Sequence, residues 1–205
     1  MPLQPDNATS PVDAGVLLGC GLAGKPGQAM YPFVRMLKEI WINRRASPLG
    51  VTDMHVSHHL CWPWDLDLWV ELNNGRTLTL FDLGRIPLAM RTGLGGTLRR
   101  EGWAMTVAGN STRYRRRVRA FDRLEMHSRC IGWDARFIYM EQSMWRAGDC
   151  TSHVLIRSAV TSAAGIVPPA QLLQAMGRAD PSPPLPDWVR AWIAADAERP
   201  WPPES

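Results

Sequence analysis

Residues 62–85 read WPWDLDLWVELNNGRTLTLFDLGR, and this stretch contains the groups on which the interpretation of the chain rests. Two carboxylates, Asp65 and Asp67, precede an Asn-Asn-Gly step at residues 73–75, and an apolar run with helical spacing follows. The first turn of a helix presents unpaired N–H groups and a partial positive charge, which stabilise an oxyanion. A carboxylate just before such a turn can attack a carbonyl carbon or activate a water molecule.

The composition is that of one domain with a sizeable core. The chain has 205 residues, of which 45% are hydrophobic and ten are tryptophan. No stretch approaches the roughly 20 apolar residues of a membrane-spanning helix. The four cysteines form no CxxC pair, which predicts reduced thiols in a cytoplasmic protein and argues against a zinc ribbon. Residues 17–20 resemble a lipoprotein cleavage site, but no Lys or Arg precedes them, so no lipid anchor is expected.

The net charge of +4 owes much to an arginine cluster at residues 113–119. Such a cluster binds phosphates on a nucleotide-bearing substrate or on nucleic acid, or forms a solvated strand end. No aromatic platform or recognised nucleic-acid module accompanies it, so nucleic acid is not an expected partner.

The residue pattern divides the chain into a flexible arm at 1–29, a main domain at 30–177, and a proline-rich linker with a terminal helix at 178–205. Apolar spacing predicts an amphipathic helix at 31–45, which we expect to pack on its own domain rather than on a membrane. Further predicted helices are 74–91, 168–176 and 187–197, with Pro87 kinking the first of these or ending it early. Predicted strands are 50–62, 103–118, 123–132, 136–146 and 150–162, the last four forming an antiparallel meander.

Two other chemistries fit the sequence poorly. On a strand, His55 and His59 share a face roughly 13 Å apart and His58 points to the other side, so the three do not converge on a metal ion. The chain has no G-x-S-x-G elbow, and Ser111 lies within a predicted strand, which argues against a serine hydrolase.

Residues 31–177 resemble the hotdog-fold acyl-CoA thioesterases of the 4-hydroxybenzoyl-CoA thioesterase-like superfamily. They are most similar to the thioesterase-superfamily-member-6-like branch, which has an extra N-terminal helix. The resemblance implies an α+β hotdog fold, in which an antiparallel sheet of about five strands wraps around a central long helix, with extra N- and C-terminal helices. It also implies a homodimer or homotetramer with active sites at the subunit interface. The matching segments are Tyr31-Pro32, Trp62–Leu68, Asn73–Arg76, Phe81–Arg85, Arg113-Tyr114 and Val167–Pro169.

The resemblance assigns roles to particular residues. The second carboxylate of the D-x-D motif is the usual catalytic group in the family, and here it is Asp67. A backbone N–H near Asn74 or Gly75 is implied to polarise the thioester carbonyl, while the Asn-Asn step also has the character of a helix N-cap. Asp82 holds the position of a family acid on the central helix. The expected substrate contacts are Trp69, Asn73, Asp82, Arg113, Arg115 and Arg116, the arginines being chosen on charge alone.

The chain departs from the family text L-N-L-H-M-N-N-G-R-Y at Trp69, Glu71 and Thr77, which replace Asn, His and Tyr. Two hypotheses follow. The first is an acyl-CoA thioesterase, with Asp67 as base or nucleophile, no metal and no cofactor beyond the CoA of its substrate. The second is a catalytically degenerate hotdog protein that binds acyl-CoA or another acyl ligand without hydrolysis. Acyl length, and CoA against acyl-carrier protein, stay open.

Overall fold

A single antiparallel sheet organises the computed structural model, which describes residues 31–200 and 202–203. The predicted arm at 1–29 lies outside these residues. The strand order is β1-β3-β4-β5-β2, and β6 pairs with β5. The strands are β1 (His55–Leu60), β2 (Ala104–Tyr114), β3 (Arg123–Trp133), β4 (Ile138–Arg146), β5 (Asp149–Ser162) and β6 (Gly165–Val167).

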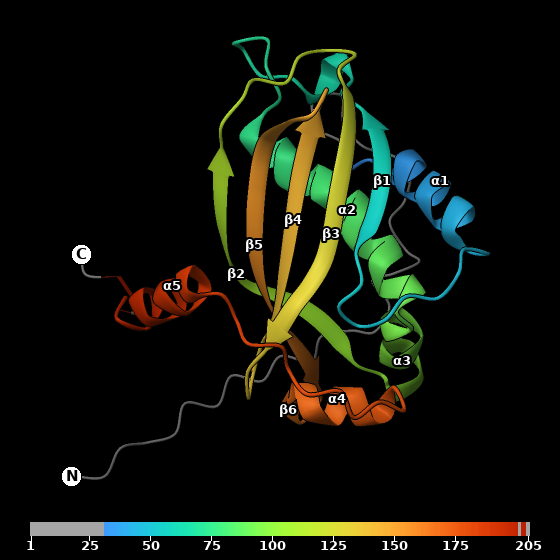
Figure 1. The fold of residues 1–205 in the computed structure, drawn as a ribbon, viewed down its shortest axis with the longest axis vertical. Coiled ribbons are helices and arrows are strands. Elements are labelled where there is room, and N and C mark those ends of the chain that lie inside the picture. The colour runs from blue at the N-terminus through green and yellow to red at the C-terminus, as the bar shows by residue number, and fades with distance from the viewer. Residues whose placement is uncertain (1–30, 201, 204–205) are drawn as a thin grey trace. The chain divides into compact units, whose positions relative to one another are not determined.

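The long helix α2 (Asn74–Arg91) lies across one face of the sheet (Figure 1). Its buried face includes Leu80, Phe81 and Leu83, which are completely inaccessible to solvent. On the sheet side, Gln142 Nε2 donates to the carbonyl oxygen of Phe81 at 2.8 Å and to Ser128 Oγ at 2.8 Å. The sheet therefore wraps around a central helix, which is the α+β hotdog arrangement that the resemblance implied.

The C-terminal helix α5 (Asp187–Ala197) covers part of the opposite face. Side chains alternate along a strand, so Tyr139 and Leu155 point away from α2, and they form a buried cluster with Val189 of α5. Arg157 Nη2 and Asp196 Oδ2 form an ion pair at 2.6 Å across the same contact. The remaining helices are α1 (Phe33–Asn43), α3 (Leu94–Glu101), α4 (Pro169–Ala175) and the 3-10 turn η1 (Pro63–Asp65).

Most predicted elements are confirmed to within a few residues. The helix predictions 74–91 and 187–197 match α2 and α5, and the four strands predicted for the meander form β2 to β5. Their predicted order was wrong: β3, β4 and β5 form a meander, whereas β2 pairs with β5 at the edge of the sheet and not with β3. The hairpin predicted at Ala147-Gly148-Asp149 joins β4 to β5, with Ala147 and Gly148 at φ 49° and 87°.

Several boundaries were wrong for local reasons. The predicted bounds of α2 hold, but the alternative that Pro87 ends it early was wrong: α2 continues to Arg91, since proline removes only one helical hydrogen bond and the packing of this buried residue outweighs that loss. β1 begins at His55 because Gly50 N donates to Asp53 Oδ2 at 2.7 Å in a preceding turn. Helix α3 was not predicted, and its two adjacent glycines explain why. β2 ends at Tyr114, short of the predicted Val118.

The first helix packs on its own domain against α2, as predicted, but not with the expected apolar side. Val34, Leu37 and Trp41 of α1 are 80%, 64% and 65% exposed. The buried side of α1 contains Met36 together with Glu39 and Asn43. Most of the apolar residues of α1 therefore face away from the domain.

Gly84 of α2 provides a test of the contact between helix and sheet. A Cβ at this position stands 2.5 Å from Ser128 Oγ and 2.9 Å from Met126 Sδ. We expect Gly84→Ala to lower the free energy of unfolding by about 2 kcal/mol in urea denaturation, because the overpacked contact forces the helix away from the sheet. Gly96→Ala in α3 is the control: it meets no atom within 4 Å and should be neutral or stabilising. Equal effects of the two substitutions contradict this account.

Candidate functional site

A narrow hairpin between η1 and α2 carries the predicted catalytic carboxylate. The Asp65 carbonyl oxygen accepts from Asn73 N at 3.0 Å, Leu66 and Leu72 form an isolated bridge, and Asp67 N donates to the Glu71 carbonyl oxygen at 2.8 Å. Residues 65–73 therefore double back on themselves. The Leu66–Leu72 bridge lies between Asp67 and Asn73, the residue that precedes α2. We call this segment the 65–73 hairpin.

The Asp67 carboxylate is half-buried and held by its own loop. Its Oδ1 accepts from Trp69 N at 2.9 Å and, more weakly, from Glu71 N at 3.5 Å. Within residues 31–200, Oδ2 has no hydrogen bond from the protein. Asp67 thus presents one fixed carboxylate oxygen to an incoming molecule.

The start of α2 has the character predicted from the Asn-Asn-Gly step. Asn73 is the N-cap, since its Oδ1 accepts from Arg76 N at 3.0 Å. In the described chain, the N–H groups of Asn74 and Gly75 have no acceptor, and both residues are exposed. The N-cap prediction is confirmed, and two first-turn donors are left for a ligand.

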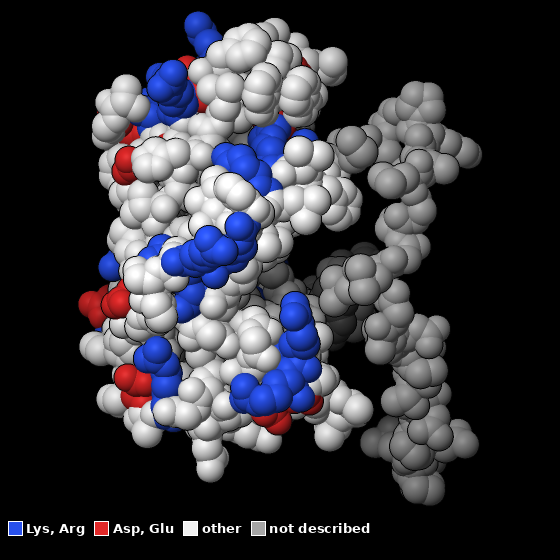
Figure 2. Space-filling model, turned by 90° about the vertical axis from the view of Figure 1, so that its right-hand side faces the viewer, with Lys and Arg blue, Asp and Glu red and all other residues white. Residues whose placement is uncertain are grey.

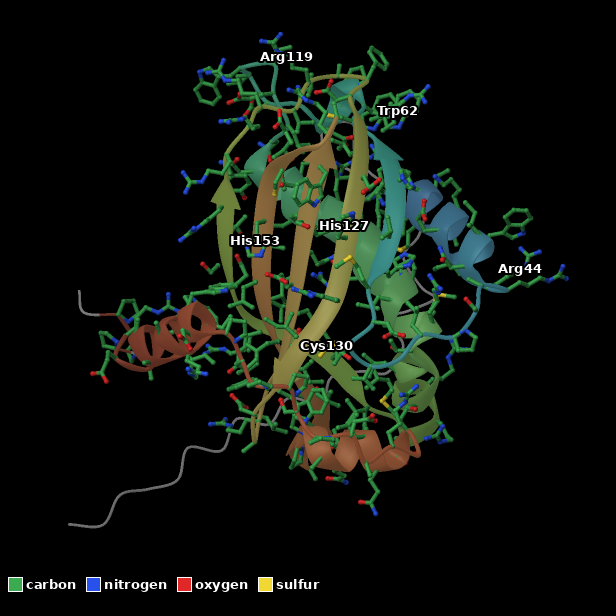
Figure 3. All side chains as sticks on the ribbon, in the orientation of Figure 1. Arg44, Trp62, Arg119, His127, Cys130 and His153 are labelled. Carbon is green, nitrogen blue, oxygen red and sulfur yellow. The ribbon has the colours of Figure 1, made fainter. Side chains whose placement is uncertain are left out.

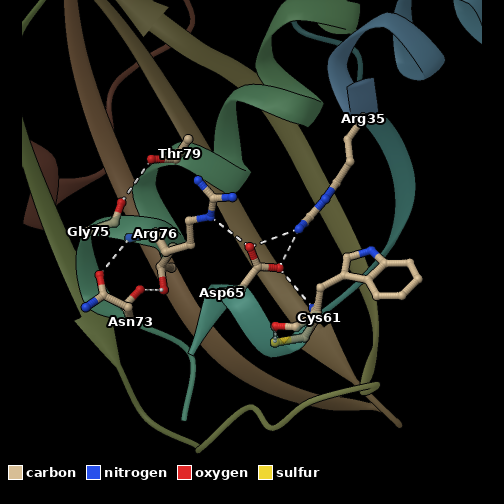
Figure 4. A network of polar contacts seen from close by, with 9 residues as sticks. Arg35, Cys61, Asp65, Asn73, Gly75, Arg76 and Thr79 are labelled. Atoms are coloured by element: carbon tan, nitrogen blue, oxygen red, sulfur yellow. Dashed lines mark hydrogen bonds and ion pairs between the residues drawn. The ribbon is translucent and has the colours of Figure 1, made fainter. Parts of the chain in front are cut away.

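Asp65, the first carboxylate of the pair, has a different environment. It is completely buried, and its Oδ1 and Oδ2 accept from Arg35 Nη2 of α1 at 2.9 and 2.7 Å. Arg76 Nε of α2 donates to Oδ1 at 2.7 Å, and Trp62 N to Oδ2 at 2.9 Å (Figure 4). We call these contacts the Asp65 clamp. Sequence reasoning missed Arg35, because nothing local connects residues thirty positions apart.

Glu71 occupies the position at which the family text has histidine, and an arginine side chain lies beside it. Arg117 Nε lies 2.9 Å from Glu71 Oε2. Leu72 N donates to the Val118 carbonyl oxygen at 2.8 Å, which sets the segment after β2 beside the 65–73 hairpin. A positive charge therefore accompanies the second acid close to Asp67.

The predicted arginines continue along the same segment. The backbone N–H groups of Arg115 and Arg116 donate to the Thr151 carbonyl oxygen at 2.8 and 3.1 Å, and their side chains are exposed. Arg113, on β2, is exposed as well. Tyr114 Oη donates to the Asn74 carbonyl oxygen at 3.2 Å, so this end of β2 reaches the start of α2. Figure 3 shows Arg119 at the same end of the sheet as Trp62.

Two predicted substrate contacts lie apart from the helix start. Trp69 is 77% exposed at the tip of the 65–73 hairpin. Asp82 forms an ion pair with Arg85 and stands about 12 Å along α2 from Asn74, at 1.5 Å per residue. The structure thus places Asp67 and Asn73 on the 65–73 hairpin that leads into Asn74 and Gly75, and Asp82 further along α2.

The nearby thiol and imidazoles have pKa values that suit packing rather than chemistry. Burial, with the charge of Asp65, raises the pKa of Cys61 to about 12, so this thiol is not a thiolate nucleophile at neutral pH. Burial lowers the pKa of His55 to about 4 and that of His59 to about 3. His55 and His59 are buried on one face of β1, and His58 is exposed on the other, as strand geometry predicted.

Two cavities lie away from the helix start. A groove of about 1060 Å³ runs along α1, β1 and β3, with Arg35, Lys38, Trp62 and Arg123 in its wall. A smaller cavity of about 40 Å³ separates the C-terminal part of α2 from α4. Neither cavity includes Asp67, Asn74 or Gly75.

Comparison with known proteins gives a family match. The model of the thioesterase-like superfamily matches residues 61–193. Protein THEM6 of Xenopus laevis is 36% identical over 80 residues, which are 39% of each chain. Protein THEM6 of Drosophila melanogaster is 31% identical over 100 residues, or 48% of this chain and 52% of the relative. The chain thus spans about half the length of these relatives, or less.

Solved structures share the fold at low sequence identity. The protein named Probable Thioesterase from Escherichia coli has a TM-score of 0.55 at 16% identity, over 60% of this chain and 98% of its own. A 1,4-dihydroxy-2-naphthoyl-CoA thioesterase from Synechocystis has a TM-score of 0.53 at 12% identity, over 60% of this chain and 95% of its own. These likenesses confirm the hotdog fold.

Conservative substitution of the two carboxylates should lower the stability of the protein by very different amounts. Asp65→Asn removes the charge between two arginines that are only 16% and 11% exposed, so we expect the free energy of unfolding to fall by about 3 kcal/mol. Asp67→Asn retains the acceptor for Trp69 N and should change it by less than about 0.5 kcal/mol. Urea denaturation of both variants measures this difference. Similar losses contradict the division of roles.

Proposed function

The chain belongs to the thioesterase-like superfamily, and from this membership we propose that it is an acyl-CoA thioesterase. It hydrolyses a thioester to a carboxylic acid and free CoA. The observation that carries the proposal is the Asp67 carboxylate on the hairpin that leads into α2, where the N–H groups of Asn74 and Gly75 have no acceptor in the described chain. The hairpin joins the two, so both belong to one rigid segment.

In the proposed reaction, the thioester carbonyl oxygen accepts hydrogen bonds from N–H groups at Asn74 or Gly75. As a general base, Asp67 takes a proton from water while the water oxygen bonds to the carbonyl carbon. The tetrahedral intermediate then collapses, the C–S bond breaks, and the CoA sulfur leaves with its electron pair and receives the proton. As a nucleophile, Asp67 instead forms an acyl anhydride that water hydrolyses.

The remaining predicted residues bind the substrate in this proposal. Arg113, Arg115 and Arg116 contact the CoA phosphates, which fits their exposure beside the 65–73 hairpin. Trp69, Asn73 and Asp82 contact the rest of the substrate. The carbonyl oxygen of the Asn73 side chain is already bound to Arg76 N, so its amide N–H₂ is the available group. The reaction draws on no metal and on no cofactor besides the CoA of the substrate.

A homodimer completes the proposed site, and a homotetramer is two such dimers. β2 is hydrogen-bonded to β5 on one side and forms an edge of the sheet, with β1 at the opposite edge. An 11-residue edge strand is a ready template for pairing with a second copy. The proposed partner then covers Trp69 and contributes to a pocket that the single chain does not form around Asp67.

We also propose a cytoplasmic location. In the described part of the chain, Cys61, Cys130 and Cys150 are free thiols, as expected in a reducing compartment. No helix there is long and apolar enough to cross a membrane.

A second candidate function is binding of an acyl ligand without hydrolysis. Glu71 favours it, because a carboxylate has replaced the family histidine and is held by Arg117. The negative charge of Glu71 beside Asp67 changes the environment in which Asp67 contacts water and substrate.

A thiol-release assay over acyl-CoAs of increasing chain length tests the first function. We expect release from at least one substrate and a loss of about 100-fold in kcat for Asp67→Asn, because the base or nucleophile is removed. Asp180→Asn, an exposed acid outside the site, is the matched control and should retain full activity. Release that Asp67→Asn leaves unchanged contradicts the role of Asp67. Saturable acyl-CoA binding with no release at any length establishes the second function.

Light scattering tests the assembly, with an expected mass of at least twice the 23.0 kDa of the chain. Val107→Lys on β2 should shift the protein toward the monomer, because a charge enters the proposed contact. Val56→Lys is the control: Val56 is 43% exposed and lies on the opposite edge, against 47% for Val107. A monomeric protein, or equal effects of the two changes, contradicts pairing through β2.

A further inference from the structure

The first helix exposes most of its apolar residues and buries two polar ones beside Met36. Val34, Leu37 and Trp41 are 80%, 64% and 65% exposed, and their spacing places them on one side of α1. Glu39 and Asn43 are buried, with 4% and 9% exposure. We call the exposed side, Val34, Leu37 and Trp41, the outer face of α1. A contiguous exposed apolar face marks a contact surface for another body.

Buried polar contacts hold the helix in this orientation. Arg35 belongs to the Asp65 clamp, and Glu39 Oε1 lies 2.9 Å from Lys38 Nζ and 3.8 Å from His59 Nδ1. Asn43 Nδ2 donates to the Glu39 carbonyl oxygen at 2.9 Å. Rotating α1 to bury its apolar residues breaks these contacts and leaves buried charges unpaired. The outer face therefore stays outside.

The exposed charges on α1 and just after it are positive. Lys38, Arg44 and Arg45 are exposed, and the Arg44 guanidinium lies 4.3 Å from the centre of the Trp41 ring. The one acid of α1, Glu39, is buried. Glu39 is paired with Lys38, so in a symmetric contact between two copies Arg44 and Arg45 face each other without acids from α1 to neutralise them. An anionic surface complements them.

We propose that α1 docks on an anionic lipid bilayer, with its outer face among the acyl chains and Lys38, Arg44 and Arg45 at the lipid phosphates. Trp, Leu and Val on one side with Lys and Arg beside them are the composition of helices that lie in a membrane interface. Each basic residue near such a surface strengthens binding.

The position of α1 leaves this face accessible. α1 lies beside β1, at the opposite edge of the sheet from β2 (Figure 1). Val34 and Lys38 also line the groove that contains Arg123 and Glu125 of β3. On the face shown in Figure 2, Lys and Arg side chains cover more of the surface than Asp and Glu do. The inference is independent of the thioesterase proposal.

Flotation of the full chain with vesicles tests the docking. We expect binding to vesicles of phosphatidylcholine and phosphatidylglycerol, weaker binding to phosphatidylcholine alone, and release by salt. Leu37→Ser/Trp41→Ser should weaken the partition by about tenfold, because apolar side chains leave the lipid. Arg44→Gln/Arg45→Gln should remove most of the preference for anionic lipid. The control is Ile166→Ser/Trp188→Ser, whose residues are 41% and 43% exposed on β6 and α5 and should not matter.

The other outcomes each overturn the proposal. Absence of binding to both vesicles, or binding that Leu37→Ser/Trp41→Ser leaves unchanged, shows that the outer face does not enter lipid. A lower mass of that variant in light scattering assigns the face to a second copy. A lower midpoint of thermal unfolding assigns it to contacts within the chain, because replacing exposed apolar residues otherwise costs little stability.

Discussion

A completely buried carboxylate organises this structure. Burying a charge costs several kcal/mol unless partners replace its hydration, and Asp65 receives two arginines and a backbone N–H. These donors come from α1, from the start of α2 and from Trp62. The clamp therefore fixes three segments against one another at the point where the 65–73 hairpin begins. Charge-assisted hydrogen bonds also form only within a narrow range of geometries, so the clamp fixes the orientation of these three segments as well as their contact.

The clamp explains how two carboxylates, two residues apart, come to differ. Each oxygen of Asp65 accepts from two donors and the residue is completely buried, so its lone pairs are not available to a substrate. Asp67, two residues further along the hairpin, lies past the clamp, where only its own loop donates to it. Environment rather than residue type thus separates a structural acid from a candidate reactive one. The same principle divides the work between carboxylates in many acid–base sites.

The sequence was informative where the governing interactions are local. The α2 start could be predicted because Asn73 caps a backbone N–H three residues away, and the β4–β5 hairpin because Gly148 supplies a positive φ. Fold and site needed the family resemblance, since neither spacing nor composition distinguishes Asp65 from Asp67. The orientation of α1 could not be predicted. Apolar periodicity gives the existence of an amphipathic helix but not the side that faces inward, and Arg35 finds its partner thirty residues away.

That orientation links the clamp to the candidate site. Arg35 of α1 and Arg76 of α2 bind the same carboxylate, so the outer face of α1 and the first turn of α2 have a fixed relation. If α1 were joined to the domain only by a flexible linker, its orientation relative to the first turn of α2 would not be fixed. Here a buried ion pair, with two arginines that are at most 16% exposed, transmits the direction of one helix to the other. Whatever covers Val34, Leu37 and Trp41 therefore also has a fixed direction relative to the first turn of α2. The polar residues on the inner side of α1 follow from this constraint: that side holds Arg35 for the clamp, with Met36, Glu39 and Asn43 buried beside it, and Val34, Leu37 and Trp41 are left on the outside.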